Sequence, residues 1–183
     1  MIKGSTGVNS RRRNREQPSP GFRPSGDRTN LTAMRQPYDD DLARVRQWFE
    51  RLAGHVRAVD FAGARTIFAP DMIAFGTFTD FMTGRDKAEG EQWRNVWPHI
   101  DDFRWRAEMR AIVSPDRLTA VGMAIFDSTG YAADGTAYAR PGRATVVFGR
   151  SAVGEDWLAL HTHMSLFRDV PTRSFKGKPE KLA

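Results

Sequence analysis

Apolar residues recur at helical spacing over residues 41–59. They lie three or four positions apart and so form one continuous stripe along a helix, which comprises Leu42, Val45, Phe49, Leu52, Val56 and Val59. The acidic residues Asp39 to Asp41 stand at the start of this stripe. We expect them to supply N-cap oxygens and to suit the positive end of the helix dipole.

Two shorter helices are predicted after the first. One covers residues 61–68, with Asp60 as its cap and Pro70 as its stop. The other covers residues 85–97, and its apolar face is expected to carry Ala88, Trp93, Val96 and Trp97. All three predicted helices therefore lie within the first 97 residues of the chain.

The rest of the pattern is that of strands. Apolar and polar residues alternate strictly over 102–113, which indicates a strand with one buried and one solvated face. Further strands are predicted over 72–78, 118–128, 142–150 and 157–167. Early helices followed by a meander of long strands predict an α+β fold, in which the helices cover one face of a curved, mostly antiparallel sheet.

Charge and composition divide the chain into three parts. Residues 1–37 are rich in Arg, Ser, Pro and Gly and are expected to be disordered, 38–170 to form the folded domain, and 171–183 to be a flexible basic tail. The net charge of +6 belongs to the ends, since residues 34–170 hold 17 basic and 19 acidic side chains. Nucleic-acid binding is therefore expected only through the basic N-terminal segment, if that segment is not inert.

Several classes of function are excluded by what the sequence lacks. Without cysteine there is no disulfide and no cysteine-ligated metal site. No apolar run is long enough to span a bilayer, and the first thirty residues contain no apolar signal segment, so we expect no membrane partner and a cytoplasmic location. Phosphate-binding glycine loops and the zinc-protease and serine-hydrolase motifs are absent, and no cofactor is expected.

The segment WLALHTHMS, from Trp157 to Ser165, contains two of the four histidines. Strict alternation would place Ala159, His161 and His163 on one face of a strand. A metal site needs at least a third ligand, and no carboxylate follows before Asp169, so no metal site is predicted. Two interpretations stay open for the histidines: a structural role, at a neighbouring strand or a dimer face, and an acid/base or ligand-contacting role.

The order of elements and four segments of the sequence resemble the SnoaL-like branch of the nuclear transport factor 2-like superfamily. The segments are Ala62 to Gly76, Gly84 to Trp93, Gly142 to Arg150 and Trp157 to Ser165, and the resemblance covers residues 41–168. It implies a cone-shaped α+β barrel with three N-terminal helices, a pocket between sheet and helices, and a homodimer. Members include isomerases, dehydratases, polyketide cyclases and kinase association domains, so fold alone does not give function.

Catalytic members often carry a carboxylate or a tyrosine in the pocket, and the first predicted helix contains no tyrosine. For an enzyme of this kind we expect cofactor-free acid/base chemistry, isomerisation, dehydration or cyclisation, on a small apolar carbonyl substrate. His161 or His163 would carry the proton, with Asp80 or Asp127 as its partner. Arg143 would polarise a carbonyl or bind an anionic group; the alternative is an ion pair with Asp127, Asp80 or Glu108.

Aromatic residues are candidates for the wall of the pocket. Phe75, Trp93, Trp97, Phe103, Trp105 and Tyr138 could surround a small apolar or aromatic ligand, although aromatic residues on helix and strand faces also form ordinary core. The competing hypothesis for the whole chain is a non-catalytic dimerisation or association module of the same fold.

Overall fold

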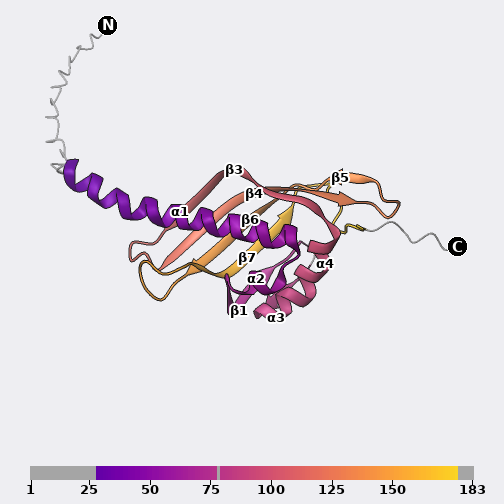
Figure 1. Cartoon of the computed structure of the whole chain (residues 1–183), viewed down its shortest axis with the longest axis horizontal. Coiled ribbons are helices and arrows are strands. Elements are labelled where there is room, and N and C mark those ends of the chain that lie inside the picture. Colours follow the sequence, from indigo (N-terminus) through magenta and orange to yellow (C-terminus); the bar gives the residue numbers. More distant parts are fainter. Residues whose placement is uncertain (1–27, 78, 177–183) are drawn as a thin grey trace, which may run out of the picture.

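A curved sheet of seven strands forms the body of the protein in the computed structural model, which describes residues 28–77 and 79–176 (Figure 1). The strands are β1 (Phe68–Phe75), β2 (Phe81–Thr83), β3 (Asp101–Val113), β4 (Thr119–Tyr131), β5 (Ala137–Ala139), β6 (Gly142–Gly149) and β7 (Leu158–Leu166). Their order is β2-β1-β7-β6-β4-β3, with β5 paired to β4. Only the β1–β7 pair is parallel, and the sheet curves without closing. The predicted α+β fold is confirmed.

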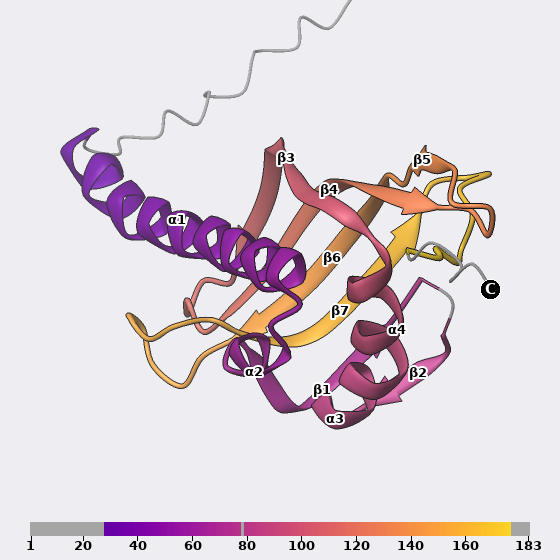
Figure 2. The same ribbon diagram turned by 45° about the vertical axis from the view of Figure 1, so that its right-hand side comes forward.

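The helices lie on one side of this sheet. They are α1 (Arg28–Ala58), α2 (Phe61–Arg65), α3 (Arg85–Ala88) and α4 (Arg94–Val96). The long helix α1 crosses the sheet near β3, while α3 and α4 lie beside β1 and β2 (Figure 2). Helices and sheet together enclose the core.

The predicted apolar stripe of α1 is the side of the helix that faces the sheet. Val45, Phe49, Leu52 and Val56 are all buried, together with Trp48, whose indole Nε1 donates to the carbonyl of Ile67. Val59 does not belong to the stripe, because the helix has ended and this residue has a positive φ of 53°. Asp60 caps α2 as predicted, its carboxylate accepting from the amide of Gly63 at 2.8 Å.

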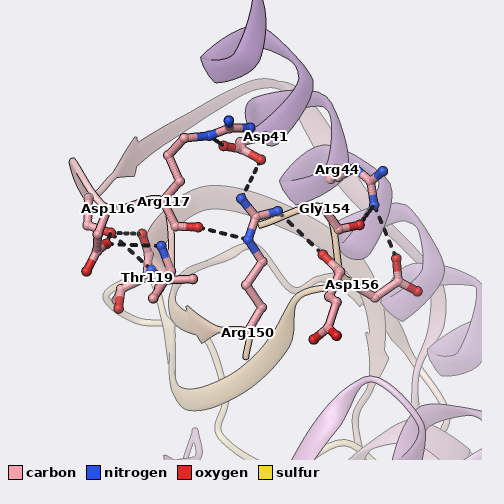
Figure 3. Close-up of polar contacts among 11 residues, drawn as sticks. Asp41, Arg44, Asp116, Arg117, Thr119, Arg150, Gly154 and Asp156 are labelled. Atoms are coloured by element: carbon pink, nitrogen blue, oxygen red, sulfur yellow. Dashed lines mark hydrogen bonds and ion pairs between the residues drawn. The ribbon is translucent and has the colours of Figure 1, made fainter. Parts of the chain in front are cut away.

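The prediction that Asp41 caps the first helix is wrong, because α1 begins at Arg28. Asp41 instead lies within the helix, 1% exposed, and its carboxylate accepts from Arg117 Nε and Arg150 Nη2, both at 2.7 Å (Figure 3). Arg150 in turn packs over the Trp157 ring at 4.0 Å. This three-residue ion cluster, Asp41, Arg117 and Arg150, joins α1 to the turns after β3 and β6.

The segments that flank the predicted folded domain have regular structure or contacts of their own. The backbone of residues 28–37 belongs to α1, although Pro37 has no amide hydrogen to donate within the helix. Residues 171–176, predicted as flexible, are held by hydrogen bonds to the body through Thr172, Arg173, Ser174 and Phe175. The predictions for residues 1–27 and 177–183 lie outside the described residues.

The third predicted helix is a chain of four short pieces. Between α3 and α4 lies a π-helical turn, η1 (Glu89–Trp93), and a 3-10 turn, η2 (Trp97–His99), follows α4. A π turn inserts one residue into the helical repeat and is often found at functional sites. Here it turns the neighbouring side chains of Gln92 and Trp93 both into the protein, where both are buried.

Candidate functional site

A β-bulge in β7 decides which way the two histidines point. Phe148 pairs with Ala159, but Val147 pairs with His161, so Leu160 is one extra residue against β6. A shift of one residue exchanges the two faces of a strand. The prediction that Ala159, His161 and His163 share a face is therefore wrong: Ala159 and Thr162 point into the core, while both histidines lie on the outer face.

The histidines make contacts of a structural kind on that outer face. His161 Nδ1 lies 2.9 Å from the carbonyl oxygen of Ile73 on the neighbouring strand. Because a carbonyl only accepts, Nδ1 carries the hydrogen in this contact. Both imidazoles also pack edge-on against Phe75, at 5.8 Å for His161 and 5.5 Å for His163. Of the two interpretations left open by the sequence, these contacts favour the structural one.

The other predicted catalytic residues also lie away from the interior. Asp80 is exposed in the loop between β1 and β2. Asp127 lies on the outer face of β4 and pairs with Arg106 at 2.9 Å. Arg143 is also on the outer face, over the Phe167 ring at 5.3 Å, and neither predicted ion-pair partner on the sheet is bound to it. The structure therefore places the two histidines, Arg143 and Asp127 on the outer face of neighbouring strands and Asp80 in a loop, and it places none of them in the interior.

A cavity of about 60 Å³ lies between the inner face of the sheet and the helices. Its walls are mostly apolar and come from every layer of the fold: Leu52 and Val56 of α1, Ala74 of β1, Val96 of α4, Phe126 of β4 and Met164 of β7. Four polar side chains interrupt this lining, Thr77, Gln92, Arg140 and Thr162. No aspartate, glutamate or histidine is among the described residues that line it.

The predicted aromatic residues divide between this cavity and other places. Phe75, Trp93, Trp97 and Phe103 contribute to the cavity wall, and the two indoles are stacked with centroids 5.1 Å apart. Trp105 is buried elsewhere in the core and donates from Nε1 to the Phe49 carbonyl at 2.7 Å. Tyr138 lies on β5, and its hydroxyl donates to the Arg173 carbonyl.

Arg140, which the sequence analysis did not select, is the most deeply buried charged side chain near the cavity. It is 2% exposed, and its backbone is fixed to Ser128 by two hydrogen bonds. Its guanidinium donates to the Thr172 carbonyl at 3.3 Å, whereas Nε has no hydrogen-bond partner. Burial lowers the pKa of Arg140, and the neighbouring Tyr138 hydroxyl opposes part of that shift.

A signal for Arg140 was present in the strand pattern. Every second residue of β6, from Gly142 to Phe148, is buried, and the same alternation continued backwards reaches Arg140. Pro141 and the preceding polar loop conceal this continuation in the sequence. Gln92 had a similar signal, because it lies midway between Ala88 and Val96 on the predicted apolar helix face.

Gln92 is the second polar side chain of the cavity with an unsatisfied atom. It is 8% exposed, its Nε2 lies 3.4 Å from Thr77 Oγ1, and its Oε1 has no partner. Space for this amide depends on Gly76, where a Cβ atom would come within 2.0 Å of Gln92 Oε1. A buried amide that lacks a partner can accept or, after rotation of the amide, donate one hydrogen bond to a ligand.

A second, more polar pocket of about 410 Å³ adjoins the first. The two share Val96, Ile100 and Arg140, so the arginine lies where they meet. Its outer wall is the C-terminal segment from Thr172 to Phe175, and its other polar side chains include Asn95 and His99, whose Nδ1 is buried without a partner. This volume falls within the roughly 300–1,000 Å³ typical of small-molecule sites.

The described residues offer neither a group of metal ligands nor a membrane-spanning helix. None of the His, Asp and Glu side chains between residues 28 and 176 gather in a group of three that could hold a metal ion. No helix in that part of the chain has both the length and the apolar character needed to cross a membrane.

Comparison with known proteins places this arrangement in a family. The family model described as "SnoaL-like domain" matches residues 45–169. No curated protein sequence matches the chain. Many solved structures do, and among them is a ketosteroid isomerase-like protein from Erwinia carotovora atroseptica, with 16% identity and a TM-score of 0.60 over 69% of this chain and 96% of that one.

Two further structures show the range of proteins with this fold. A nuclear transport factor 2-like protein with a cystatin-like fold from Novosphingobium aromaticivorans has 19% identity and a TM-score of 0.60, covering 79% of this chain and 93% of its own. The CaMKII hub of S. rosetta has 18% identity and a TM-score of 0.57, covering 68% and 95%. At these identities the likeness establishes the fold.

Proposed function

Because the chain belongs to the SnoaL-like domain family, we propose that it binds a small, largely apolar molecule in the cavity between its sheet and its helices. The observation that carries this proposal is the lining of that cavity: apolar walls interrupted by a few convergent polar groups, two of which have unsatisfied atoms. Such a lining is typical of ligand sites. The adjoining pocket offers a route from solvent.

A more specific form of this proposal is that the protein catalyses isomerisation, dehydration or cyclisation of the bound molecule by acid/base chemistry. It would have to work without His161 and His163, which lie on the other side of the sheet from the cavity. The side chains within reach of a ligand in the inner cavity are amide, hydroxyl and guanidinium groups, which orient and polarise a substrate more readily than they remove a proton at neutral pH. Binding is therefore the function that the lining supports best.

We expect a panel of small apolar metabolites to contain at least one compound that raises the melting temperature of the full chain. At about 100 times its Kd a ligand stabilises by about 2.7 kcal/mol, which corresponds to a shift of roughly 5–10 °C for a protein of this size. Ala74→Leu should weaken binding of the same compound at least about tenfold, because Ala74 is 2% exposed and lines the small inner cavity.

Ile73→Leu is the matched control for this experiment. Ile73 is the neighbouring residue on β1 but points to the outer face, where it is 41% exposed. The control should bind as the unmodified chain does. Equal binding by all three proteins would place the ligand outside the cavity. The proposal itself would be contradicted if the panel contained no compound that stabilises the protein.

A second candidate function, association of two copies through the outer face of the sheet, is favoured by a specific row of residues. The strand registers place side chains from five strands side by side on that face: Ile112, Val121, Val147, His161 and Ile73. Ile112 is 66% exposed and Ile73 is 41% exposed. An apolar row of this kind on a monomer is typical of an interaction surface. The chain resembles a superfamily whose members usually form dimers, and its fold is similar to that of a CaMKII hub. Both observations support a second copy of this chain as the partner that covers the outer face.

Val121→Glu is expected to raise the dissociation constant of the dimer by roughly 100-fold or more. Val121 is at the second position of the row, and an unpaired carboxylate buried in an interface costs about 3–5 kcal/mol. Sedimentation equilibrium of the full chain measures the effect. Val153→Glu, an equal change at a residue 49% exposed in the turn after β6, should leave the dimer intact. If the parent chain stays monomeric even at about 100 times the protein concentration of a typical assay, this function is ruled out.

A further inference from the structure

The geometry points to a carboxylate as the polar group of the ligand: we propose that Arg140 binds the carboxylate of a small amphipathic acid, whose apolar part occupies the inner cavity. This inference rests on the proposed function and gives the chemical class of the ligand. Arg140 is the one charged side chain that the described residues place in the wall of both the inner cavity and the adjoining pocket. The inner cavity would take the apolar part, and the pocket would admit the acid.

The burial of Arg140 is the first argument. A guanidinium keeps its proton in proteins, so a side chain that is 2% exposed holds a positive charge inside the fold. Removing such a charge from water is unfavourable unless an anion or several hydrogen bonds compensate for it. Within residues 28–77 and 79–176, no carboxylate lies within ion-pair distance of Arg140.

The hydrogen bonds of Arg140 are the second argument. Of the five N–H groups of a guanidinium, one donates to the Thr172 carbonyl at the rather long distance of 3.3 Å, the neutral Tyr138 hydroxyl is a further polar neighbour, and Nε is unsatisfied. Arg150, whose side chain is 0% exposed, is by contrast compensated, because it binds Asp41 at 2.7 Å. A ligand carboxylate could accept two parallel hydrogen bonds from Nε and Nη, the geometry in which arginine recognises carboxylates.

The position of Arg140 between the two pockets is the third argument. Beyond it, the inner cavity is lined by the stacked indoles of Trp93 and Trp97 and by Phe103, which suit an aliphatic chain or a flat ring. The cavity measures about 60 Å³, so a slim apolar group fits better than a polycyclic one. Gln92 then offers one further hydrogen bond to a hydroxyl or carbonyl on the same ligand.

Paired probes that differ only in charge test this inference. Hexanoate and hexanamide, and likewise phenylacetate and phenylacetamide, are titrated into the full chain by calorimetry at low salt. We expect each acid to bind at least about tenfold more tightly than its amide, since hydrogen bonds to a charged group are the stronger kind. Arg140→Gln should remove this preference, and Arg140→Lys, which keeps the charge but not the two-pronged geometry, should retain part of it.

Arg143→Gln is the matched control, because it removes the same charge from the outer face, away from both pockets. The Arg143→Gln variant should prefer the acid over the amide by the same factor as the unmodified chain. The preference of the unmodified chain is measured without any variant, so the inference stays open to refutation even if Arg140→Gln does not fold.

Equal binding of acid and amide, or a preference for the acid that survives in Arg140→Gln, would overturn the carboxylate site. If neither acid binds while a neutral compound of the metabolite panel does, the carboxylate inference fails and the proposed function stands. If no compound of any kind binds, both fail together.

Discussion

Asp41→Asn is expected to lower the free energy of unfolding by about 3–5 kcal/mol, the cost of removing one partner from a buried ion pair. Asp41 is 1% exposed, and it is the carboxylate partner of the Arg150 side chain, which is 0% exposed (Figure 3). Asparagine keeps the shape of the side chain but removes the carboxylate that neutralises the buried guanidinium of Arg150. Urea unfolding followed by tryptophan fluorescence measures the change.

Asp39→Asn provides the control for this prediction. Asp39 is exposed two residues earlier on the same helix, so its replacement should alter the free energy of unfolding by no more than about 0.5 kcal/mol. Similar effects of the two substitutions would mean that the ion cluster of Asp41, Arg117 and Arg150 adds nothing beyond a surface contact.

The same cluster makes stability depend on pH in a predictable direction. Burial alone would raise the pKa of Asp41, but the hydrogen bonds and charges of Arg117 and Arg150 outweigh burial and hold the pKa below its usual value. A carboxyl whose pKa is lower in the folded state stabilises the fold above its unfolded pKa, and this contribution is lost as the pH falls through the folded pKa. The difference in stability between the parent chain and Asp41→Asn should therefore shrink as the pH is lowered below about 4.

Phe49→Ala should have an effect of similar size, about 3–5 kcal/mol, through a different mechanism. Phe49 is 0% exposed and packs edge-on against Trp48, Trp105 and Phe148. Gly122 of β4 leaves room for its ring, since a Cβ atom there would lie 2.6 Å from Phe49 Cε2. Truncation would leave a cavity that this tightly packed aromatic group cannot fill by small movements.

Glu50→Ala, one position along α1 and exposed, is the comparison for Phe49→Ala. It should change the free energy of unfolding by less than about 0.5 kcal/mol. A loss below about 1 kcal/mol for Phe49→Ala would mean that α1 packs against the sheet less closely than the ring contacts indicate.

The arrangement of helices and strands could be predicted from the sequence, because local periodicity indicates which side of a helix or strand is buried. The stripe through Val45, Phe49 and Leu52 and the alternation in β3 both depend only on neighbours in the chain, and both reappear in the structure. The short strands β2 and β5 were missed, since three residues are too few to show a period. The break in the third helix was missed because a π turn has no clear local signature.

The residues of the candidate site were harder to predict from the sequence than the fold. Trp93, Trp97 and Phe103 were selected from the sequence and do line the cavity, because aromatic residues on apolar faces point inwards. Phe75 also contributes to the lining, although its ring packs against the two histidines of the outer face. The predicted acid/base group was assembled from strand alternation, and one bulge at Leu160 was enough to turn its two histidines to the outer face. Arg140 was overlooked because a lone arginine before a proline resembles an ordinary loop residue.

The sequence by itself determined the class of fold, the buried face of α1 and the positions of the longer strands, since these follow from patterns among residues close in sequence. Only the tertiary structure decided which face of β7 meets the cavity, that Asp41 is a buried ion partner and that Arg140 is an internal cation. Those three outcomes depend on residues from distant segments, such as Arg150 beside Asp41 and Thr172 beside Arg140. No local pattern records such pairings, because they exist only after the sheet has curved and the segment around Thr172 has packed against it.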